Sequence, residues 1–256
     1  MKIALMFPGQ GSQSTGMLAQ LAEKYGQLRE RFALASEVIG QDLWAISQEE
    51  DKSYLLNQTA ITQPILLAAG MGCYDILRAE TGANGDFFAG HSLGEYTALC
   101  AAGALDYKKA IDLVHNRGRL MQAAVGPGEG AMAAILGLED KQVVEVCDEV
   151  GKDVSAANFN SPGQVVIAGK TAAVERAIAL AKEKGAKRAV LLPVSVPSHC
   201  SLMRAASAEL SNFLTRINWQ KPSALQRGCQ VAAQHGIYCP PAGGTALSAG
   251  TLEQLH

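Results

Sequence analysis

The serine best placed to act as a nucleophile lies in the segment Gly-His-Ser-Leu-Gly, residues 90–94. Residues 86–90 read as a short buried strand, and residues 93–103 have a helical pattern rich in small residues. A serine on a sharp strand-to-helix turn presents its hydroxyl to a cleft, and flanking glycines leave room for the turn. The N-terminus of the following helix suits a developing oxyanion. The pattern predicts a nucleophilic Ser92, and the alternative is a glycine-rich turn with an incidental serine.

A serine hydroxyl is a weak nucleophile without a general base, and histidine is the usual base. The chain has five histidines: His91, His115, His199, His235 and His256. His91 adjoins the serine, so we expect its side chain to point away and to pack within the turn. His199 follows a predicted strand in a loop and is the best candidate. The other three lie in a helical pattern or in the unusual C-terminal tail.

Other readings of these residues remain open. Cys200 lies beside His199 and suggests a thiol catalyst, but adjacent residues rarely form a nucleophile–base pair. A Ser-His-Asp hydrolase would need an acid that orients the histidine, placed between serine and histidine in the chain. Three aspartates lie there without a motif context: Asp112, Asp140 and Asp153. A serine esterase or thioesterase is therefore a weakened reading that stays open.

Hydrophobic patterns predict the elements that position Ser92. Residues 2–7 read as a buried strand that enters a loop over residues 8–16. Helices are expected over residues 17–39, 63–79 and 107–125, with Pro64 in the first turn of the second, where a missing N–H costs little.

The hydrophobic pattern changes near Gly126 and from there predicts elements in the order β-α-β-β-α-β, which is that of the ferredoxin-like unit. Its predicted strands and helices are residues 130–137, 139–150, 153–159, 164–169, 171–185 and 187–194. A helical pattern returns over residues 199–217.

Composition excludes several classes of protein. The 256 residues carry 22 Lys and Arg against 24 Asp and Glu, and 48% are hydrophobic, which excludes extensive disorder and disfavours a general nucleic-acid binder. We find no run of 18 apolar residues and no signal peptide, so we expect no transmembrane helix and no export. The six cysteines form no Cys-x-x-Cys pair or zinc pattern, and we expect reduced thiols and no metal.

Six ordered segments resemble the malonyl-CoA:acyl carrier protein transacylase family. They are Phe7–Gln13, Gly90–Tyr96, Asn116–Gln122, Gly130–Ile135, Asn158–Gly169 and Val194–His199. The resemblance runs from residue 3 to about residue 220 and points to the bacterial enzyme of type II fatty acid synthesis.

The resemblance implies a role for each matched residue. Ser92 would carry the malonyl group as an ester, and His199 would serve as general base and then as general acid. The backbone N–H groups of Gln10 and Leu93 would form the oxyanion hole. The reaction passes from thioester to ester to thioester with nearly balanced ends, so it implies no cofactor.

Arg117 would hold the malonyl carboxylate, and Gln63 would line the site. A hydrogen bond to a charged group contributes about 1.5–3 kcal/mol, which is roughly a 10- to 150-fold preference for malonyl over acetyl. From the residues alone, Arg117 reads as a solvated helix arginine. The implied partners are malonyl-CoA and acyl carrier protein, without nucleic acid or membrane, and we expect a monomer in the cytoplasm.

The expected fold class is α/β, with a parallel-sheet hydrolase-like core and an inserted ferredoxin-like subdomain. We place the core at residues 1–126 and 196–222, the subdomain at 127–195 and an atypical tail at 223–256. The tail has no charged residue over 25 positions, 228–252, and departs from the family pattern after Pro222. We interpret it as a truncated or frameshifted end, the alternative being a loop-rich segment. We therefore expect a transacylase that is impaired or poorly folded, the alternative being a carrier-binding remnant.

Overall fold

The computed structural model describes residues 2–194, 196–223 and 225–226, which form two compact units. Unit 1 comprises the described residues of Met1–Arg119 and Ser211–His256, and unit 2 is Leu120–Leu210. Nearly all of the predicted tail, with His235 and His256, lies outside the described residues.

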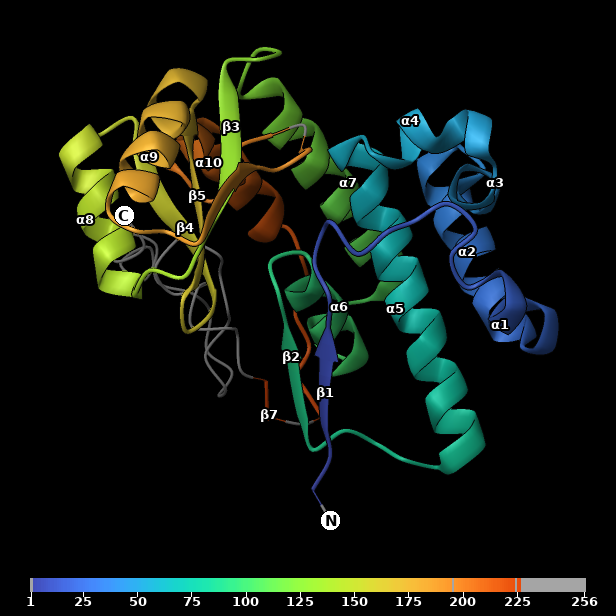
Figure 1. The fold of residues 1–256 in the computed structure, drawn as a ribbon. Helices are drawn as coiled ribbons and strands as arrows, with labels where there is room; N and C mark the ends of the chain where they lie inside the picture. Colours follow the sequence, from blue (N-terminus) through green and yellow to red (C-terminus); the bar gives the residue numbers. More distant parts are fainter. Residues whose placement is uncertain (1, 195, 224, 227–256) are drawn as a thin grey trace. The chain divides into compact units, whose positions relative to one another are not determined.

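A parallel sheet of order β1-β2-β7 forms the centre of unit 1 (Figure 1). Its strands are β1 (Ala4–Phe7), β2 (Phe87–Gly90) and the two-residue β7 (Leu225–Gln226). Phe7 is the register partner of Gly90, so β1 and β2 end side by side. Because parallel strands end at one edge of a sheet, the loop after β1 and the turn after β2 start from the same edge.

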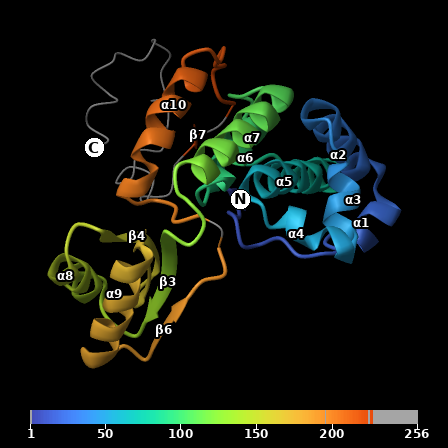
Figure 2. The ribbon, with the colours of Figure 1, turned by 90° about the horizontal axis from the view of Figure 1, so that it is seen from above.

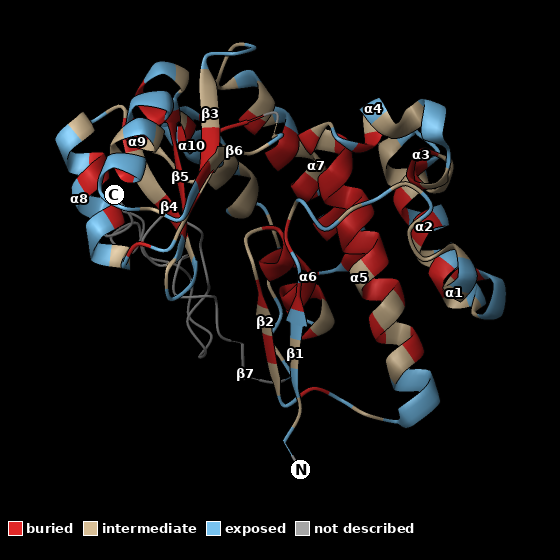
Figure 3. Cartoon of the chain, in the orientation of Figure 1, coloured by how far each residue is buried: buried red, intermediate tan, exposed pale blue. Residues whose placement is uncertain are grey.

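Helix α5 (Thr59–Thr81) is the longest helix among the described residues of unit 1. By length and composition α5 could cross a membrane, a possibility that the sequence criterion missed. However, 72% of its apolar window is buried, and Figure 3 shows the buried surface along most of the helix. This burial is typical of the core helix of a globular unit. The other helices that begin in residues 1–119 are α1 (Ala19–Lys24), α2 (Gly26–Ile39), α3 (Leu43–Gln48), η1 (Glu50–Lys52), α4 (Ser53–Leu56), α6 (Gly94–Ala101) and α7 (Tyr107–Ala123).

Two predicted helices need correction. The helix expected over residues 17–39 is divided at Tyr25, whose backbone is extended, into α1 and α2. Helix α5 begins at Thr59 rather than residue 63, so Pro64 lies inside the helix and not in its first turn. A proline cannot donate to the carbonyl four residues earlier. That carbonyl, of Ala60, instead lies 2.9 Å from Nδ1 of His115, so the adjacent helix α7 supplies a polar contact.

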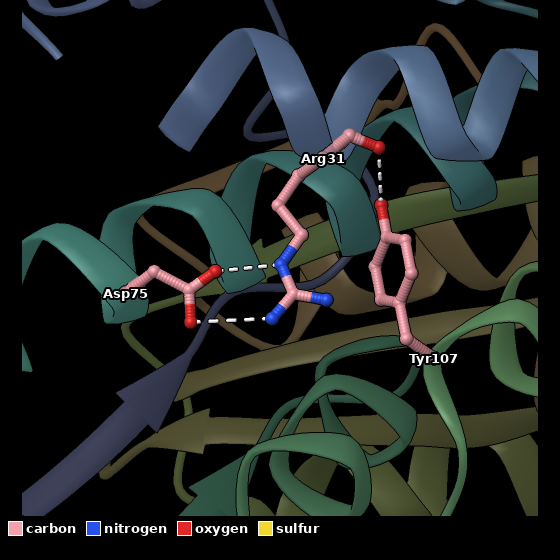
Figure 4. A network of polar contacts seen from close by, with 3 residues as sticks. All are labelled: Arg31, Asp75 and Tyr107. Atoms are coloured by element: carbon pink, nitrogen blue, oxygen red, sulfur yellow. Dashed lines mark hydrogen bonds and ion pairs between the residues drawn. The ribbon is translucent and has the colours of Figure 1, made fainter. Parts of the chain in front are cut away.

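A polar network joins three helices of unit 1 (Figure 4). Arg31 on α2 donates from Nε and Nη2 to the carboxylate of Asp75 on α5, at 2.6 and 3.2 Å. Tyr107, the first residue of α7, donates to the Arg31 carbonyl at 2.6 Å, and its ring lies 4.5 Å from the guanidinium carbon. These contacts fix α2 and the start of α7 relative to α5.

Unit 2 contains the βαββαβ arrangement that the sequence predicts. Its elements are β3 (Gly130–Leu136), α8 (Asp140–Val150), β4 (Val154–Ser161), β5 (Gln164–Lys170), α9 (Thr171–Glu183) and β6 (Arg188–Leu191). The strands form an antiparallel sheet of order β4-β5-β3-β6, and both helices cover one face (Figure 2). A buried core between this face and the helices includes Ile135, Val146 and Val174. The chain continues through η2 (Ser201–Met203) into α10 (Arg204–Leu214). Helix α10 begins in unit 2, and its last residues, from Ser211, belong to unit 1.

Candidate active site

Ser92 lies on a strained turn between β2 and α6. Its φ angle is 52°, in the left-handed region that residues with a side chain seldom adopt. The turn is held on one side by the His91 N–H, which donates to the Phe7 carbonyl at 3.0 Å. On the other side, the Glu95 N–H donates to the Ser92 carbonyl at 3.1 Å, starting the helix. This strand–turn–helix geometry is the context that a nucleophile elbow requires.

The glycines on either side of Ser92 are required by close packing. A Cβ at Gly90 would overlap the backbone of Gly94, two residues beyond the serine. A Cβ at Gly94 would overlap the Phe7 carbonyl and lie 2.8 Å from the Pro8 carbonyl oxygen. Real Cβ atoms do not approach so closely, so the elbow is packed directly against the end of β1. The predicted reason for the glycines is therefore confirmed.

Arg117, on α7, is buried and directed toward the nucleophile. Its side chain donates to Gln63 Oε1 on α5 at 2.9 Å and to Ser92 Oγ at 3.3 Å. Its guanidinium carbon also lies 5.5 Å from the ring centre of Tyr96 on α6. The residue is only 6% exposed, so the solvated-arginine reading is wrong. A buried cation beside the serine, with partners that carry no charge, is suited to binding an anion.

Helices α5 and α7 touch through their backbones next to this arginine. A Cβ at Gly118 would lie 2.5 Å from Ala60 Cα and 2.6 Å from the Thr59 carbonyl oxygen. Only glycine permits this approach, which brings Arg117 within reach of Gln63, one turn further along α5. The structure thus brings together three of the predicted site residues from three elements.

The two residues predicted for the oxyanion hole lie at the sheet edge described above. Leu93 is buried at the N-cap of α6, where the first helical N–H groups have no partner within the helix. Gln10 lies in the loop after β1, and its Nε2 donates to Thr59 Oγ1 at 3.1 Å. Thr59 is fully buried at the start of α5. The loop that carries Gln10 is therefore tied to the core by a side chain that the sequence did not suggest.

His199, the predicted general base, belongs to unit 2. It lies just before η2 and, like Ser92, has a positive φ, 60°. Among the described residues only three non-glycine positions have positive φ, and Ser92 and His199 are two of them. Such conformations cost about 1–3 kcal/mol each and concentrate at functional sites. The strain therefore supports the choice of these two residues.

The reading of Cys200 as a thiol catalyst loses support from the structure. Burial raises the pKa of the Cys200 thiol, whose Sγ contacts the Pro197 carbonyl at 3.1 Å, and a protonated thiol is a poor nucleophile. Of the three candidate aspartates, Asp112 Oδ1 accepts from the Asn116 amide and Asp153 Oδ1 pairs with Lys170 at 3.1 Å. Asp140 has a buried Oδ1 without a hydrogen-bond partner among the described residues. No group of three metal-ligating side chains occurs within the part of the chain that the structure describes.

Sequence reasoning did not identify Thr59 or Tyr96. Tyr96 lies four residues after Ser92 in a helix, so this spacing places it one turn from the elbow and could have drawn attention to it. Thr59 gave no comparable signal, because its contact with Gln10 spans 49 residues.

The strand–elbow–helix turn, the buried arginine and the βαββαβ unit define a class of protein, the serine acyltransferases with a hydrolase-like core. Comparison with known proteins agrees. The chain belongs to the acyl transferase domain family, which matches residues 5–235, and within that family to the malonyl-CoA–acyl carrier protein transacylases. The predicted family and fold class are confirmed.

The alignments with two named relatives span most of this chain. It is 50% identical over 224 residues to the malonyl CoA-acyl carrier protein transacylase of Escherichia coli K12, covering 87% of this chain and 72% of that protein. The Haemophilus influenzae protein of the same name is 52% identical over 225 residues, with the same coverage.

Solved structures give the same result. An acyl carrier protein S-malonyltransferase from Vibrio cholerae superimposes with a TM-score of 0.84 at 53% identity, covering 88% of this chain and 74% of that one. A malonyl-transacylase in complex with its type II polyketide acyl-carrier protein gives 0.86 at 49% identity, with the same coverage.

Proposed function

We propose that this chain transfers a malonyl group from malonyl-CoA to the phosphopantetheine thiol of acyl carrier protein in fatty acid biosynthesis. The transfer proceeds through a malonyl ester on Ser92. One observation carries the proposal: the buried Arg117 donates to Gln63 and to Ser92 Oγ, so a carboxylate-binding cation adjoins the nucleophile. The relatives named above are malonyl transacylases, and one was solved with its carrier protein.

In the first half-reaction, Ser92 Oγ attacks the thioester carbonyl carbon while its proton passes to His199. The carbonyl oxygen becomes an oxyanion, which the backbone N–H groups of Gln10 and Leu93 stabilise. Collapse breaks the carbon–sulfur bond, and His199 returns the proton to the departing sulfur of CoA. In the second half-reaction the carrier thiol attacks the ester, and the same proton transfers return Ser92 to its hydroxyl form.

Arg117 gives the reaction its preference for an acyl group that carries a carboxylate. A guanidinium can donate two parallel N–H bonds to such a group. Hydrogen bonds to a charged group contribute about 1.5–3 kcal/mol, so malonyl is favoured over acetyl by roughly 10- to 150-fold. We further propose that the chain acts as a cytoplasmic monomer.

The proposal is tested by intact-protein mass spectrometry before and after brief mixing with malonyl-CoA. The expected result is one malonyl increment, which disappears when phosphopantetheinylated acyl carrier protein is added and then appears on the carrier. Ser92→Ala should show no increment. Ser14→Ala, a change at an exposed loop serine, is the matched control and should be acylated like the wild type.

Three outcomes would contradict the proposal. Release of free malonate at the same rate without the carrier would indicate a serine thioesterase. An increment that persists in Ser92→Ala would exclude this nucleophile. Binding of the carrier without an acyl-enzyme would indicate a carrier-binding remnant of a transacylase.

A further inference from the structure

We infer that Tyr96 is a positioning residue that orients the Arg117 guanidinium and thereby sets the preference for acyl groups bearing a carboxylate. The inference rests on the proposed function and extends it to a residue outside the predicted site. Tyr96 lies on α6, four residues after Ser92, and is 5% exposed. Its ring centre is 5.5 Å from the Arg117 guanidinium carbon.

Arg117 is held by contacts of two kinds. Hydrogen bonds to Gln63 and Ser92 engage one nitrogen each, Nη1 and Nη2, and determine where these nitrogens point. The Tyr96 ring adds a contact with the cation as a whole, which attracts the guanidinium toward the aromatic face. Without the ring contact, the hydrogen bonds to Gln63 and Ser92 are what remains of these three contacts. The guanidinium then gains freedom to shift, and a two-pronged bond to a carboxylate tolerates little displacement.

The chemistry of the phenol suits this role. Burial raises the pKa of Tyr96, and the charge of nearby Arg117, together with a side-chain hydrogen bond between the two residues, only partly opposes the effect. The phenol is therefore neutral at physiological pH and supplies an aromatic face without supplying a counter-charge. A carboxylate at the same place would neutralise the arginine and compete with the acyl carboxylate. Tyr96 can restrain the cation while its charge stays available to the substrate.

The chain offers a matched control in Tyr74 on α5. Tyr74 is also buried, at 6% exposure, and its ring also lies 5.5 Å from an arginine, Arg78. Its ring packs edge-on against Phe7 and Phe88. Loss of Tyr74 therefore removes comparable packing and a comparable cation–aromatic contact, without touching Arg117.

The test compares malonyl-CoA with acetyl-CoA. In Tyr96→Leu, the ratio of their kcat/KM values should fall by about 2- to 30-fold, the range expected for a lost cation–aromatic contact. The loss should be in KM for malonyl-CoA, because the carboxylate contact exists before and during the reaction. Tyr96→Phe keeps the aromatic face but loses the hydroxyl, so the ratio should fall less than in Tyr96→Leu, and Tyr74→Leu should keep the ratio. If Tyr96→Leu does not fold, Tyr96→Met is measured in its place.

A double-mutant cycle separates positioning from general packing. In an Arg117→Ala background, Tyr96→Leu should leave the ratio unchanged, because the residue it orients is gone. The inference is overturned if the ratio falls by the same factor in both backgrounds. It is also overturned if Tyr96→Leu and Tyr74→Leu lower the ratio equally.

Equilibrium binding gives an outcome that does not depend on transfer. In a Ser92→Ala background, calorimetry should show that Tyr96→Leu weakens malonyl-CoA binding by about 2- to 30-fold and leaves acetyl-CoA binding unchanged. If the wild-type chain forms no acyl-serine but Tyr96→Leu still loses the binding preference for malonyl-CoA, the proposed transfer is refuted and the role of Tyr96 is supported. An unchanged preference in a chain that does form the acyl-serine would refute the role of Tyr96 alone.

Discussion

Replacing Gly94 by alanine adds one methyl group at the point where the elbow meets β1. The added Cβ would overlap the Phe7 carbonyl and lie 2.8 Å from the Pro8 carbonyl oxygen. Both oxygens belong to the backbone, so neither can move away by a side-chain rotation. The conflict must be relieved by moving α6, the end of β1 or the loop that carries Gln10.

The expected cost is about 3 kcal/mol, the upper part of the usual range for overpacking, because rigid backbone is displaced. For a chain of this size the midpoint of thermal unfolding should fall by about 6–12 °C. Displacement of the elbow also moves Ser92, and a shift of about 1 Å costs roughly 100-fold in rate. Acylation of Ser92 by malonyl-CoA should therefore slow by about two orders of magnitude.

Gly26→Ala is the control with the same chemical change. Gly26 begins α2, and a Cβ there would meet nothing within 4 Å. Alanine restricts the unfolded chain more than glycine does, so this variant should be more stable by about 0.4–1 kcal/mol. Chemical unfolding and the rate of acyl-serine formation are measured for both. A Gly94→Ala protein as stable and as rapidly acylated as Gly26→Ala would refute the claim that the elbow has no room.

Three further predictions concern stability and the loop after β1. Asp75→Asn breaks the ion pair of Figure 4 and should lower the free energy of unfolding by about 1–3 kcal/mol, whereas Glu37→Gln, in an exposed pair, should change it by less than about 0.5 kcal/mol in the same urea titration. Burial raises the pKa of Cys147 from 9.0 to about 12, so between these pH values the folded state keeps a proton that the unfolded state has lost. The free energy of unfolding should therefore fall as the pH rises from 9 to 12, while the contribution of this thiol is fully present below pH 9. Cys147→Ala should reduce the slope of the free energy of unfolding against pH in this range. Thr59→Val removes the Gln10 contact and should slow acyl-serine formation by about 2- to 13-fold, measured by rapid quench; an unchanged rate would mean that the contact does not position the loop.

The parts of the fold that the sequence predicted are those set by local pattern. The elbow has glycines at fixed offsets from Ser92, and close packing requires them there. In the βαββαβ unit, the period of the hydrophobic residues alternates between two and about 3.6, with turns between the segments. The structure has the elements in the predicted order. In both cases the residues that decide the structure are neighbours in the chain.

The parts that were missed depend on partners far away in the chain. The family resemblance placed Arg117 in the site, but the pattern of its own helix did not predict its burial, because Gln63, 54 residues earlier, is among the partners that accommodate it in the interior. The break at Tyr25 was missed because the hydrophobic period continues through it from α1 into α2. Pattern alone does not show where a backbone turns if the same face stays apolar.

The backbone contact at Gly118 also limits how this protein can change its substrate. Because α5 and α7 already touch, they cannot move closer, and any residue larger than glycine would push them apart and separate Arg117 from Gln63. A new acyl preference therefore has to come from exchanging the side chains around the guanidinium on an unchanged pair of helices. In evolution or in the laboratory, acyl selectivity should then be adjustable through few positions, while the helix pair itself tolerates almost no variation.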